Sequence, residues 1–318
     1  MKSILGIDIG FGSVKVVFGQ SDGTITNMFK FTSVISLTEP DGYINDPRIY
    51  EYKGKHYYVG DDALQMPSEA MIDITEYKNL EYYAPLFLYY VLHQLDKSPD
   101  IIVCGLSKAQ LHNSGYFKEA LQSFTVNNTA YNFTNIWILP QGAGSKLAID
   151  EYGDNFPKKQ TQFHGQTNYV GVDIGFNTLD LFLVTNGKTS PNLFVGIEGE
   201  GVMKIASKIQ DLIKSEHSKD ISLHEAKEVL DSGLYKLRGQ KFDMHDKVQD
   251  IKKAYLQEML DLVNERFAGS LDKCDFVFLT GGGSAFFKGS QDGYVKVPQG
   301  AYEYYNGIGF FIFGSEHQ

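Results

Sequence analysis

Residues 5–18 read LGIDIGFGSVKVVF, and residues 170–184 read VGVDIGFNTLDLFLV. Each stretch has an apolar run, an aspartate, the tripeptide Ile-Gly-Phe and a second apolar run, so Asp8 and Asp173 occupy equivalent positions. The second runs are rich in β-branched and aromatic residues, which favours a strand. A dinucleotide-binding βαβ unit would instead continue with a helix after its glycines. The sequence therefore predicts two β-hairpins, each with a carboxylate near a glycine turn, in two related halves of the chain.

Length and composition limit the class of protein. The chain has 318 residues, a length typical of about two domains, and 42% of them are hydrophobic, enough for substantial cores. The formal net charge of −10 argues against a large basic surface for nucleic acid. Cys104 and Cys274 lie far apart without a CxxC partner, which fits core residues in a reducing cytoplasm. Met1 leads into a strand pattern rather than a secretory signal, and the longest apolar stretch, near residues 86–92, is too short for a membrane span.

Strand and helix patterns alternate along the rest of the chain. Helical spacing or apolar helix patterns occur at 79–95, 116–124, 201–215 and 254–267. Strand patterns occur at 101–106, at 135–140 and at the start of 274–287, and the stretch YKGKHYYVG (52–60) predicts a small hairpin. The chain ends in an apolar segment, 302–314. Strands that alternate with helices indicate an α/β fold.

The glycine turns of the two hairpins are suited to binding phosphate. Backbone N–H groups at Gly10, Gly12 and Gly175 can approach an anion closely because no Cβ intervenes. Lys15 is placed to reach a phosphate as a point charge, and the hydroxyl of Thr178 can donate to one. Two such hairpins that face each other from two domains would hold a triphosphate from both sides.

The two aspartates suggest a divalent metal, since carboxylates alone repel phosphate. Mg²⁺ prefers oxygen ligands and is often held by one or two carboxylates together with phosphates and water, so Asp8 and Asp173 are the candidate metal residues. The alternative for a single copy is an aspartate that simply begins a turn. A second copy at the start of its own half favours the metal.

A triple glycine, residues 281–283, follows a strand pattern and precedes a helical stretch. Backbone without side chains would let a flat purine ring lie against it. An ordinary strand-to-helix turn is the alternative.

The motifs DIGFGSVK (8–15), DIGFNTLD (173–180) and LTGGGSAFF (279–287) resemble, in this order, the phosphate-1, phosphate-2 and adenosine motifs of the actin, sugar kinase and DnaK-type chaperone superfamily. Within it, the chain resembles the bacterial actin-like proteins of the ParM/StbA type, which segregate plasmids. The stretches VCGLSKAQ (103–110), PQGAGSKLAID (140–150) and YYNGIGFFIFG (304–314) are similar to further elements of that group, as is the length.

The resemblance implies an α/β fold of the actin-like ATPase type, with two RNase H-like domains and a nucleotide cleft between them. Domain I would comprise residues 1–148, with a C-terminal helix of about residues 302–318 packed back on it. Domain II would comprise residues 149–301. The chain would cross between the domains around residues 140–148.

The resemblance also implies slow hydrolysis of ATP, or GTP, with Mg²⁺, and it assigns catalytic roles to Asp8, Asp173 and Gln141. Gln141 would orient the attacking water; a helix-terminal side chain bonded to backbone is the alternative. The residues assigned to the nucleotide are Gly10, Phe11, Gly12, Ser13, Lys15, Gly175, Phe176, Asn177, Thr178, Gly281, Gly282, Gly283, Glu200 and Lys204. Phe11 and Phe176 depart from the small or polar residues of the superfamily, which leaves backbone amides and Thr178 to contact phosphate.

The base side of the site is less defined by the sequence. Either Glu198, Glu200 and Lys204, or Glu225 and Lys227, could line the base and ribose, and a solvated helix face is the alternative for each. The tyrosines between residues 50 and 90 could form a domain core or a subunit contact.

The leading function is a polymerising nucleotidase whose filaments move or segregate plasmid DNA through an adaptor protein, with no direct DNA binding and no membrane contact. A non-polymerising scaffold of the same fold is the first alternative. A small-molecule kinase is the second, although no acidic motif after VCGLS supplies the base that a sugar kinase needs. Only SEHQ follows Gly314, which argues against a membrane-tethered division protein.

Overall fold

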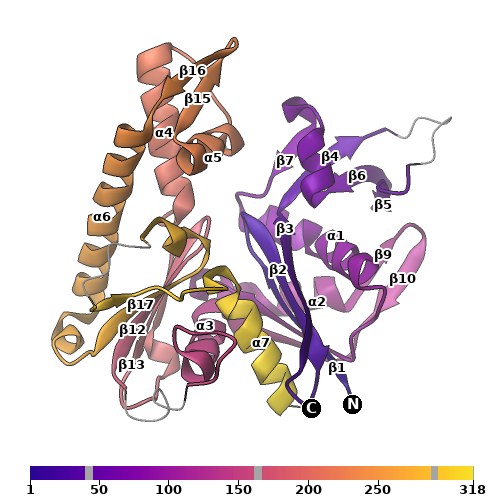
Figure 1. Cartoon of the computed structure of the whole chain (residues 1–318). Helices are drawn as coiled ribbons and strands as arrows, with labels where there is room; N and C mark the ends of the chain where they lie inside the picture. Colours follow the sequence, from indigo (N-terminus) through magenta and orange to yellow (C-terminus); the bar gives the residue numbers. More distant parts are fainter. Residues whose placement is uncertain (40–45, 161–166, 288–292, 318) are drawn as a thin grey trace.

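The computed structural model describes residues 1–39, 46–160, 167–287 and 293–317, and the chain forms two halves, each built on a five-stranded sheet (Figure 1). The first sheet has the strand order β11-β8-β1-β2-β3. Its strands are β1 (Ser3–Ile9), β2 (Ser13–Gln20), β3 (Ile25–Thr32), β8 (Ile101–Leu106) and β11 (Ile136–Pro140). Strands β1, β2 and β3 are antiparallel neighbours, while β8 runs parallel to β1 and β11 parallel to β8.

The second sheet repeats this topology with the order β14-β13-β12-β17-β18. Its strands are β12 (Tyr169–Ile174), β13 (Thr178–Val184), β14 (Phe194–Glu198), β17 (Phe276–Thr280) and β18 (Val295–Lys296). Here β12, β13 and β14 are antiparallel neighbours, β17 runs parallel to β12, and β18 parallel to β17. The repeated sequence thus forms the hairpins β1–β2 and β12–β13, as predicted, and the duplication in sequence is a duplication of topology.

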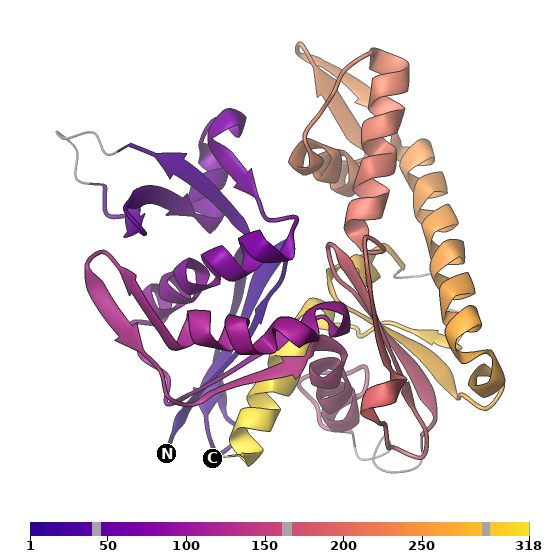
Figure 2. The ribbon, with the colours of Figure 1, turned by 180° about the vertical axis from the view of Figure 1, so that it is seen from behind.

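Helices lie on both faces of each sheet, so that the molecule has five layers (Figures 1 and 2). On the outer side of the first sheet lie α1 (Tyr77–Leu95) and α2 (Ser114–Gln122), and on that of the second lie α4 (Val202–His217) and α6 (His245–Leu271). Between the two sheets lie α3 (Gln141–Tyr152) and α7 (Tyr305–Glu316). A shared apolar cluster joins these two helices to both sheets, which connects the halves through one core.

Each half carries an extension at the same end of the molecule (Figure 1). In the first half it is a four-stranded sheet in the order β5-β6-β4-β7, with β4 (Val34–Thr38), β5 (Tyr50–Tyr52), β6 (Lys55–Val59) and β7 (Met71–Asp73). In the second half it is α5 (Leu223–Ser232) and the hairpin of β15 (Leu234–Leu237) and β16 (Gln240–Asp243). A further hairpin, β9 (Ser123–Val126) and β10 (Thr129–Asn132), lies beside α1 in the first half.

The period-two alternation of β1 decides where its aspartate points. Leu5, Ile7 and Ile9 belong to the outer core beneath α1. Gly6 and Asp8 therefore face inward, toward α3 and α7. A Cβ added to Gly6 would overlap the backbone of α7, so this position admits only glycine at the present spacing of helix and sheet.

Strand β12 has the same pattern. Val170, Val172 and Ile174 pack in the outer core with α4 and α6, and Gly171 and Asp173 face inward. The ring of Phe182 occupies the space that a side chain at Gly171 would need. The two aspartates of the repeated sequence consequently lie on the two sheet faces that look toward each other.

Helices α3 and α7 cross at a pair of glycines. A Cβ on Gly309 would overlap the carbonyl oxygen of Gly144, so the two backbones are in direct contact. One turn earlier in α7, Asn306 accepts hydrogen bonds from the backbone N–H and the hydroxyl of Ser145, both at 3.0 Å. This crossing fixes the position of the two inner helices relative to each other.

The sequence predicted both repeated hairpins, strands β8, β11 and β17, and helices α1, α2, α4 and α6, but it gave no pattern for β3, β4, β7, β9, β10, α5 or β14 to β16. Helix α2 ends at Gln122, so the last two residues of the predicted segment 116–124 belong to β9. Helix α6 begins at His245, nine residues before the predicted segment 254–267, because its first turns are largely polar and exposed. The triple glycine leads into a 3₁₀ helix, η6 (Gly282–Phe287), rather than an α-helix. The domain limits 1–148 and 149–301 stay a prediction. Over the described ranges, no helix has the length and hydrophobicity that crossing a membrane requires.

The tyrosines of the first half belong largely to its core. Tyr50, Tyr52, Tyr57 and Tyr83 are buried and contact one another or neighbouring rings edge to face. Of the two roles considered for these tyrosines, domain core or subunit contact, these four residues have the first, whereas Tyr82 is 37% exposed.

Substitution of Gly309 by alanine should destabilise the protein by about 1–3 kcal/mol, because the new methyl group forces α3 and α7 apart. Thermal or urea unfolding would measure the effect. Gly115→Ala in α2 is the matched control, since nothing lies within 4 Å of its added Cβ; it should be neutral or stabilise by up to about 1 kcal/mol. Equal effects of the two substitutions would show that the crossing is not tightly packed.

Candidate active site

A cavity of about 380 Å³ opens between the halves at the tips of the two hairpins, within the size range of small-molecule sites. Most of the residues that the sequence assigned to a nucleotide line it. They are Asp8, Gly10, Phe11, Gly12, Ser13, Lys15, Gln141, Asp173, Gly175, Phe176, Thr178, Gly281, Gly282 and Gly283. The fold thus brings together three motifs that are separated by more than 100 residues.

The wall formed by the first sheet carries a row of three charged side chains on adjacent strands. Asp8, Lys15 and Lys30 are direct neighbours in the registers of β1, β2 and β3. The ammonium of Lys15 donates to Asp8 Oδ2 at 3.1 Å. Gln141, the first residue of α3, donates from Nε2 to Asp8 Oδ1 at 2.8 Å. The Gln141 side chain therefore bonds the aspartate and not the helix backbone.

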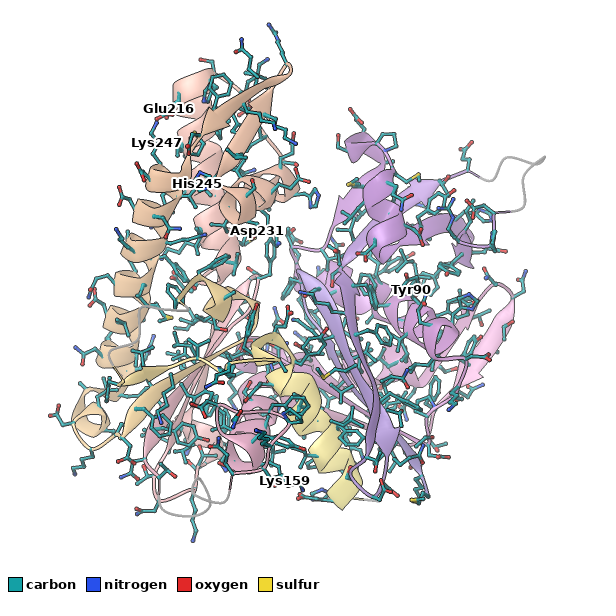
Figure 3. All side chains as sticks on the ribbon, viewed as in Figure 1. Tyr90, Lys159, Glu216, Asp231, His245 and Lys247 are labelled. Carbon is teal, nitrogen blue, oxygen red and sulfur yellow. The ribbon has the colours of Figure 1, made fainter. Side chains whose placement is uncertain are left out.

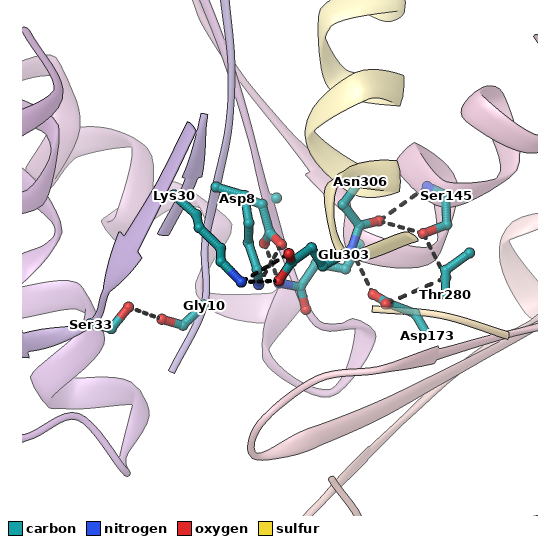
Figure 4. A network of polar contacts seen from close by, with 12 residues as sticks. Asp8, Gly10, Lys30, Ser33, Ser145, Asp173, Thr280, Glu303 and Asn306 are labelled. Atoms are coloured by element: carbon teal, nitrogen blue, oxygen red, sulfur yellow. Dashed lines mark hydrogen bonds and ion pairs between the residues drawn. The ribbon is translucent and has the colours of Figure 1, made fainter. Parts of the chain in front are cut away.

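The wall formed by the second sheet carries a matching row. Thr280, Asp173 and Asp180 are neighbours in the registers of β17, β12 and β13. Asn306 of α7 donates to Asp173 Oδ2 at 2.6 Å, and the Thr280 hydroxyl donates to Asp173 Oδ1 at 3.4 Å (Figure 4). The hydroxyl of Thr280 also lies 3.1 Å from that of Ser145, so the same network reaches α3. Both aspartates of the repeat are thus held by polar side chains from the inner helices.

Burial and mutual repulsion dominate the electrostatics of these carboxylates. Burial, together with the charge of Asp8, raises the pKa of Asp173 to about 6. Burial alone would lower the pKa of Lys15, but the charges of Asp8 and Asp173 outweigh it and keep that pKa above 10.5. A cation between the two carboxylates would relieve their repulsion.

The donor set fits a hard divalent cation that shares its coordination with water and phosphate. Asp8 and Asp173 offer carboxylate oxygens, 3% and 5% exposed, from the two walls of the cleft. No group of three or more histidine, cysteine or acidic side chains among the described residues could hold a metal by itself. Mg²⁺ suits such a site, because it is commonly held by one or two carboxylates plus substrate phosphates.

The tips of the two hairpins touch. A Cβ on Gly12 would come within 2.8 Å of the Phe176 side chain, so the glycine makes room for that ring. Phe176 packs against the cores of both halves, and Phe11 is 7% exposed. Of the two aromatic departures from the superfamily motifs, Phe176 therefore contributes to contact between the halves, whereas Phe11 belongs to the core of the first half.

Asn177 does not line the cleft, although the sequence assigned it to phosphate. Its side-chain Nδ2 donates to the carbonyl of Thr75, in the segment between β7 and α1, at 3.3 Å. The residue follows the turn and points to the side of the hairpin that faces the first half. It makes a second link across the tips, next to Phe176.

Glu200 and Lys204, which the sequence assigned to the nucleotide, do not line the cavity. Lys204 is held by Glu200 at 2.6 Å and by Glu258 of α6 at 3.0 Å. Glu198 accepts from Gln110 at 2.9 Å instead. These side chains bind elements of the fold to one another.

Helix α5 supplies cleft residues in their place. His224, Lys227 and Asp231 line the cavity, together with Phe286 and Tyr302 from the segments near the triple glycine. Of the two sets of residues considered for the base and ribose, only the one with Glu225 and Lys227 therefore contributes a residue, Lys227, to the cavity lining.

Its companion Glu225 is instead part of the capping box that begins α5. The Ser222 backbone N–H donates to its carboxylate at 2.8 Å. Glu225 thus stabilises the start of the helix that carries Lys227.

Asp180 is a buried acid of this region that the sequence did not single out. It accepts from the Ser107 hydroxyl at 2.9 Å and from the Lys108 backbone N–H at 2.8 Å, so a strand of the second half is bonded to the first. Burial, then the charge of Asp173, raises the pKa of Asp180 to about 7. The sequence does contain a sign of this position: Asp180 follows Asp173 by seven residues across the hairpin turn, a spacing that makes the two residues direct cross-strand neighbours.

Both halves of the chain match protein-family models of actin-like proteins. Residues 6–144 match the family model of the N-terminal domain of actin-like proteins, and residues 171–290 match that of the C-terminal domain of archaeal MreB-like actin homologues. A comparison of the sequence with curated proteins gives no match.

Solved structures of actin-like proteins have the same fold over the full chain. The crystal structure of Ta0583, an archaeal actin homologue, has a TM-score of 0.77 at 18% identity and covers 100% of both chains. The ParM of a 15-stranded filament from Clostridium botulinum has 0.76 at 17%, covering 99% of both chains. Bacillus thuringiensis ParM with ATP has 0.63 at 18%, covering 100% of this chain and 99% of the other.

Two duplicated sheets, a helix layer between them and a cleft at the hairpin tips define a protein of the actin fold. The two family models together span most of the chain, one in each half. Each half of the chain matches a family model of actin-like proteins, and the whole chain has the actin fold. The fold and the family resemblance expected from the sequence are thereby confirmed.

The raised pKa values of Asp173 (about 6) and Asp180 (about 7) predict that stability falls as pH rises. The folded state holds these protons more tightly than the unfolded state, so the contribution of these two groups to stability is fully present below about pH 4 and is lost as the pH rises to about 7. Without added nucleotide or Mg²⁺, Asp180→Asn should remove part of the difference in unfolding free energy between pH 5 and pH 8, on the order of 2 kcal/mol.

Chemical denaturation at the two pH values would measure this difference. The matched control is Asp250→Asn on the exposed face of α6, which removes the same formal charge and should leave the difference as in the parent. An Asp180→Asn protein with the parental pH dependence would contradict the assignment.

Proposed function

We propose that this actin-like protein is a Mg²⁺-dependent nucleoside triphosphate hydrolase that assembles into filaments. One observation carries the proposal: the two copies of the hairpin place Asp8 and Asp173 on facing walls of a single cleft. The inner helices add Gln141 and Asn306 to those carboxylates. A site built from both halves suits a ligand whose binding depends on how the halves are arranged.

The proposed ligand is a nucleoside triphosphate with its phosphates at the hairpin tips. Backbone N–H groups around Gly10, Gly12 and Gly175, with Lys15 and Thr178, would bind phosphate oxygens. The triple glycine and α5 would border the base. The archaeal homologue has been solved with ADP (TM-score 0.74, 18% identity), and the Bacillus thuringiensis ParM with ATP, which supports ATP as the nucleotide. GTP is the alternative.

Hydrolysis in such a site is mainly positioning and neutralisation of charge. A bound Mg²⁺, held through Asp8 and Asp173, would neutralise phosphate charge. Gln141 would orient the attacking water from the N-terminus of α3. Its hydrogen bond to Asp8 supports this role, because the bond places the amide beside one of the two carboxylates.

Filament assembly is the proposed use of this chemistry. The Clostridium botulinum ParM is a subunit of a filament, and head-to-tail contacts between subunits give open filaments when the rotation does not close. With a net charge of −10, contact with plasmid DNA would run through an adaptor protein in the cytoplasm. A non-polymerising scaffold of the same fold is the competing function.

Substitutions in the cleft should separate binding from chemistry. Asp8→Asn and Asp173→Asn keep side-chain shape but remove the charges, so hydrolysis of Mg·ATP should fall by about 10²-fold or more and affinity should lose its dependence on Mg²⁺. Gln141→Ala should lower kcat by about 10²-fold with a change in Kd below about threefold, because a water-orienting group acts in the transition state.

Phosphate release and nucleotide titration would measure the two effects. Parental hydrolysis by both aspartate variants would contradict the metal assignment. A weaker Kd with unchanged kcat would make Gln141 a binding residue.

Nucleotide should control assembly. If the filament favours one arrangement of the halves and the triphosphate favours the same one, binding and assembly are coupled. Light scattering, sedimentation and negative-stain microscopy with ATP, ADP and a non-hydrolysable analogue should show filaments with the triphosphates and their loss after hydrolysis. Moderate salt should favour assembly by screening the acidic subunits. Monomers in all conditions, well above micromolar concentration, would support the scaffold.

A further inference from the structure

The lysines that line the cleft are each paired with a carboxylate that also lines it. The pairs are Lys15–Asp8 at 3.1 Å, Lys30–Glu303 at 2.7 Å and Lys227–Asp231 at 2.7 Å. Two of the pairs are local: one lies within the β1–β2 hairpin, and the other spans one turn of α5. The cleft therefore contains anions that compete with any phosphate for its cations.

The pair Lys30–Glu303 differs because it is formed over a sequence separation of 273 residues. Lys30 lies on β3 of the first sheet, and Glu303 lies in η7 (Tyr302–Tyr304), the 3₁₀ turn immediately before α7. Both carboxylate oxygens accept from the Lys30 ammonium, at 2.8 and 2.7 Å (Figure 4). The Glu303 side chain is 18% exposed and that of Lys30 48%, so the cation remains accessible from solvent.

Lys30 is also the direct neighbour of Lys15 in the register of β2 and β3. Neighbouring strands are about 4.8 Å apart, so two ammonium-bearing side chains project side by side from the same wall. Asp8 forms an ion pair with Lys15, and Glu303 forms one with Lys30. Glu303 is close enough to contribute to the raised pKa of Lys15 as well. Two adjacent cations suit a polyphosphate, whose charge is spread over several phosphates, better than they suit a single phosphate.

We propose that Lys30 is a second polyphosphate-binding cation of the cleft and that Glu303 is a built-in competitor, which the phosphates of a nucleotide displace. The inference rests on the proposed nucleotide binding and adds a residue that the sequence motifs did not contain. Displacement has a structural consequence: Glu303 directly precedes α7, and Asn306 of that helix holds Asp173. Polyphosphate on Lys30 thus acts on the segment that positions the opposite wall.

The test compares Kd values for Mg·ATP, Mg·ADP and adenosine in the parent and in Lys30→Met, Glu303→Gln and the double variant. Lys30→Met keeps the apolar stem and should weaken Mg·ATP by about tenfold. Glu303→Gln should tighten it by about two- to fivefold, because the competing charge is gone. In the Lys30→Met background, Glu303→Gln should have no further effect. Adenosine affinity should be the same for all four proteins.

A matched control is Glu216→Gln, which breaks the ion pair of Glu216 with Lys247 (2.5 Å) between α4 and α6 (Figure 3). Lys247 is exposed to a similar extent as Lys30 (50% and 48%), Glu216 is more exposed than Glu303 (33% and 18%), and the pair lies outside the cleft lining. It should leave all three Kd values unchanged. Unfolding without nucleotide, measured for every variant, separates a change of fold stability from a change of binding.

A Glu303→Gln protein that binds Mg·ATP with parental or lower affinity would overturn the inference, as would an unchanged Kd for Lys30→Met. If Lys30→Met does not fold, Glu303→Gln alone decides. A parent protein that binds no nucleotide would overturn the proposed function and the inference together, whereas parental binding with unresponsive variants overturns only the inference.

Discussion

The contact of two glycines, Gly144 in α3 and Gly309 in α7, determines how the rest of the molecule is arranged. Because no side chain separates these helices, both fit into the single layer between the two sheets and share one apolar cluster with each of them. The same crossing sets polar groups at the cleft end of the layer. Gln141 at the start of α3 reaches Asp8, and Asn306 in the first turn of α7 bonds Asp173 and Ser145. Helix packing and the polar site are therefore one structural unit.

The strands add the second requirement, which is a consistent alternation. In both copies of the repeat the residues before and after the aspartate are apolar and belong to an outer core, so the aspartate must face inward. The glycine two positions earlier, Gly6 or Gly171, leaves room for α7 or for the Phe182 ring. A shift of either strand by one residue would point its carboxylate into the apolar outer core. Fold and site thus use the same pattern of residues.

Much of this arrangement could be predicted from the sequence, because the hairpins and the three glycine motifs are local patterns. The interactions that complete the cleft are not local. Lys30 lines it only through strand register, Asp180 lies behind Asp173 for the same reason, and Glu303 meets Lys30 over a separation of 273 residues. Glu200 and Lys204 lie outside the cavity lining, which the sequence could not indicate, because a helix pattern shows which residues share a face and not what covers that face; here Glu258 of α6 covers it.

The distribution of charge on the two walls bears on how ligand binding and the distance between the halves depend on each other. On the strands, the first wall carries Asp8, Lys15 and Lys30, and the second carries Asp173 with Asp180 behind it, whereas Lys227 of α5 is balanced by Asp231. The strand residues of the first wall therefore have a surplus of cations and those of the second a surplus of carboxylates. The proposed ligand, a polyphosphate with a divalent cation, would interact favourably with both walls, and its binding free energy would then depend on the distance between them. Any surface contact that favours the same distance is coupled to it by an equal and reciprocal free energy. Phe176, Asn177 and Asp180 join the two halves beside the cleft, so a change in the distance between the walls would have to alter these contacts.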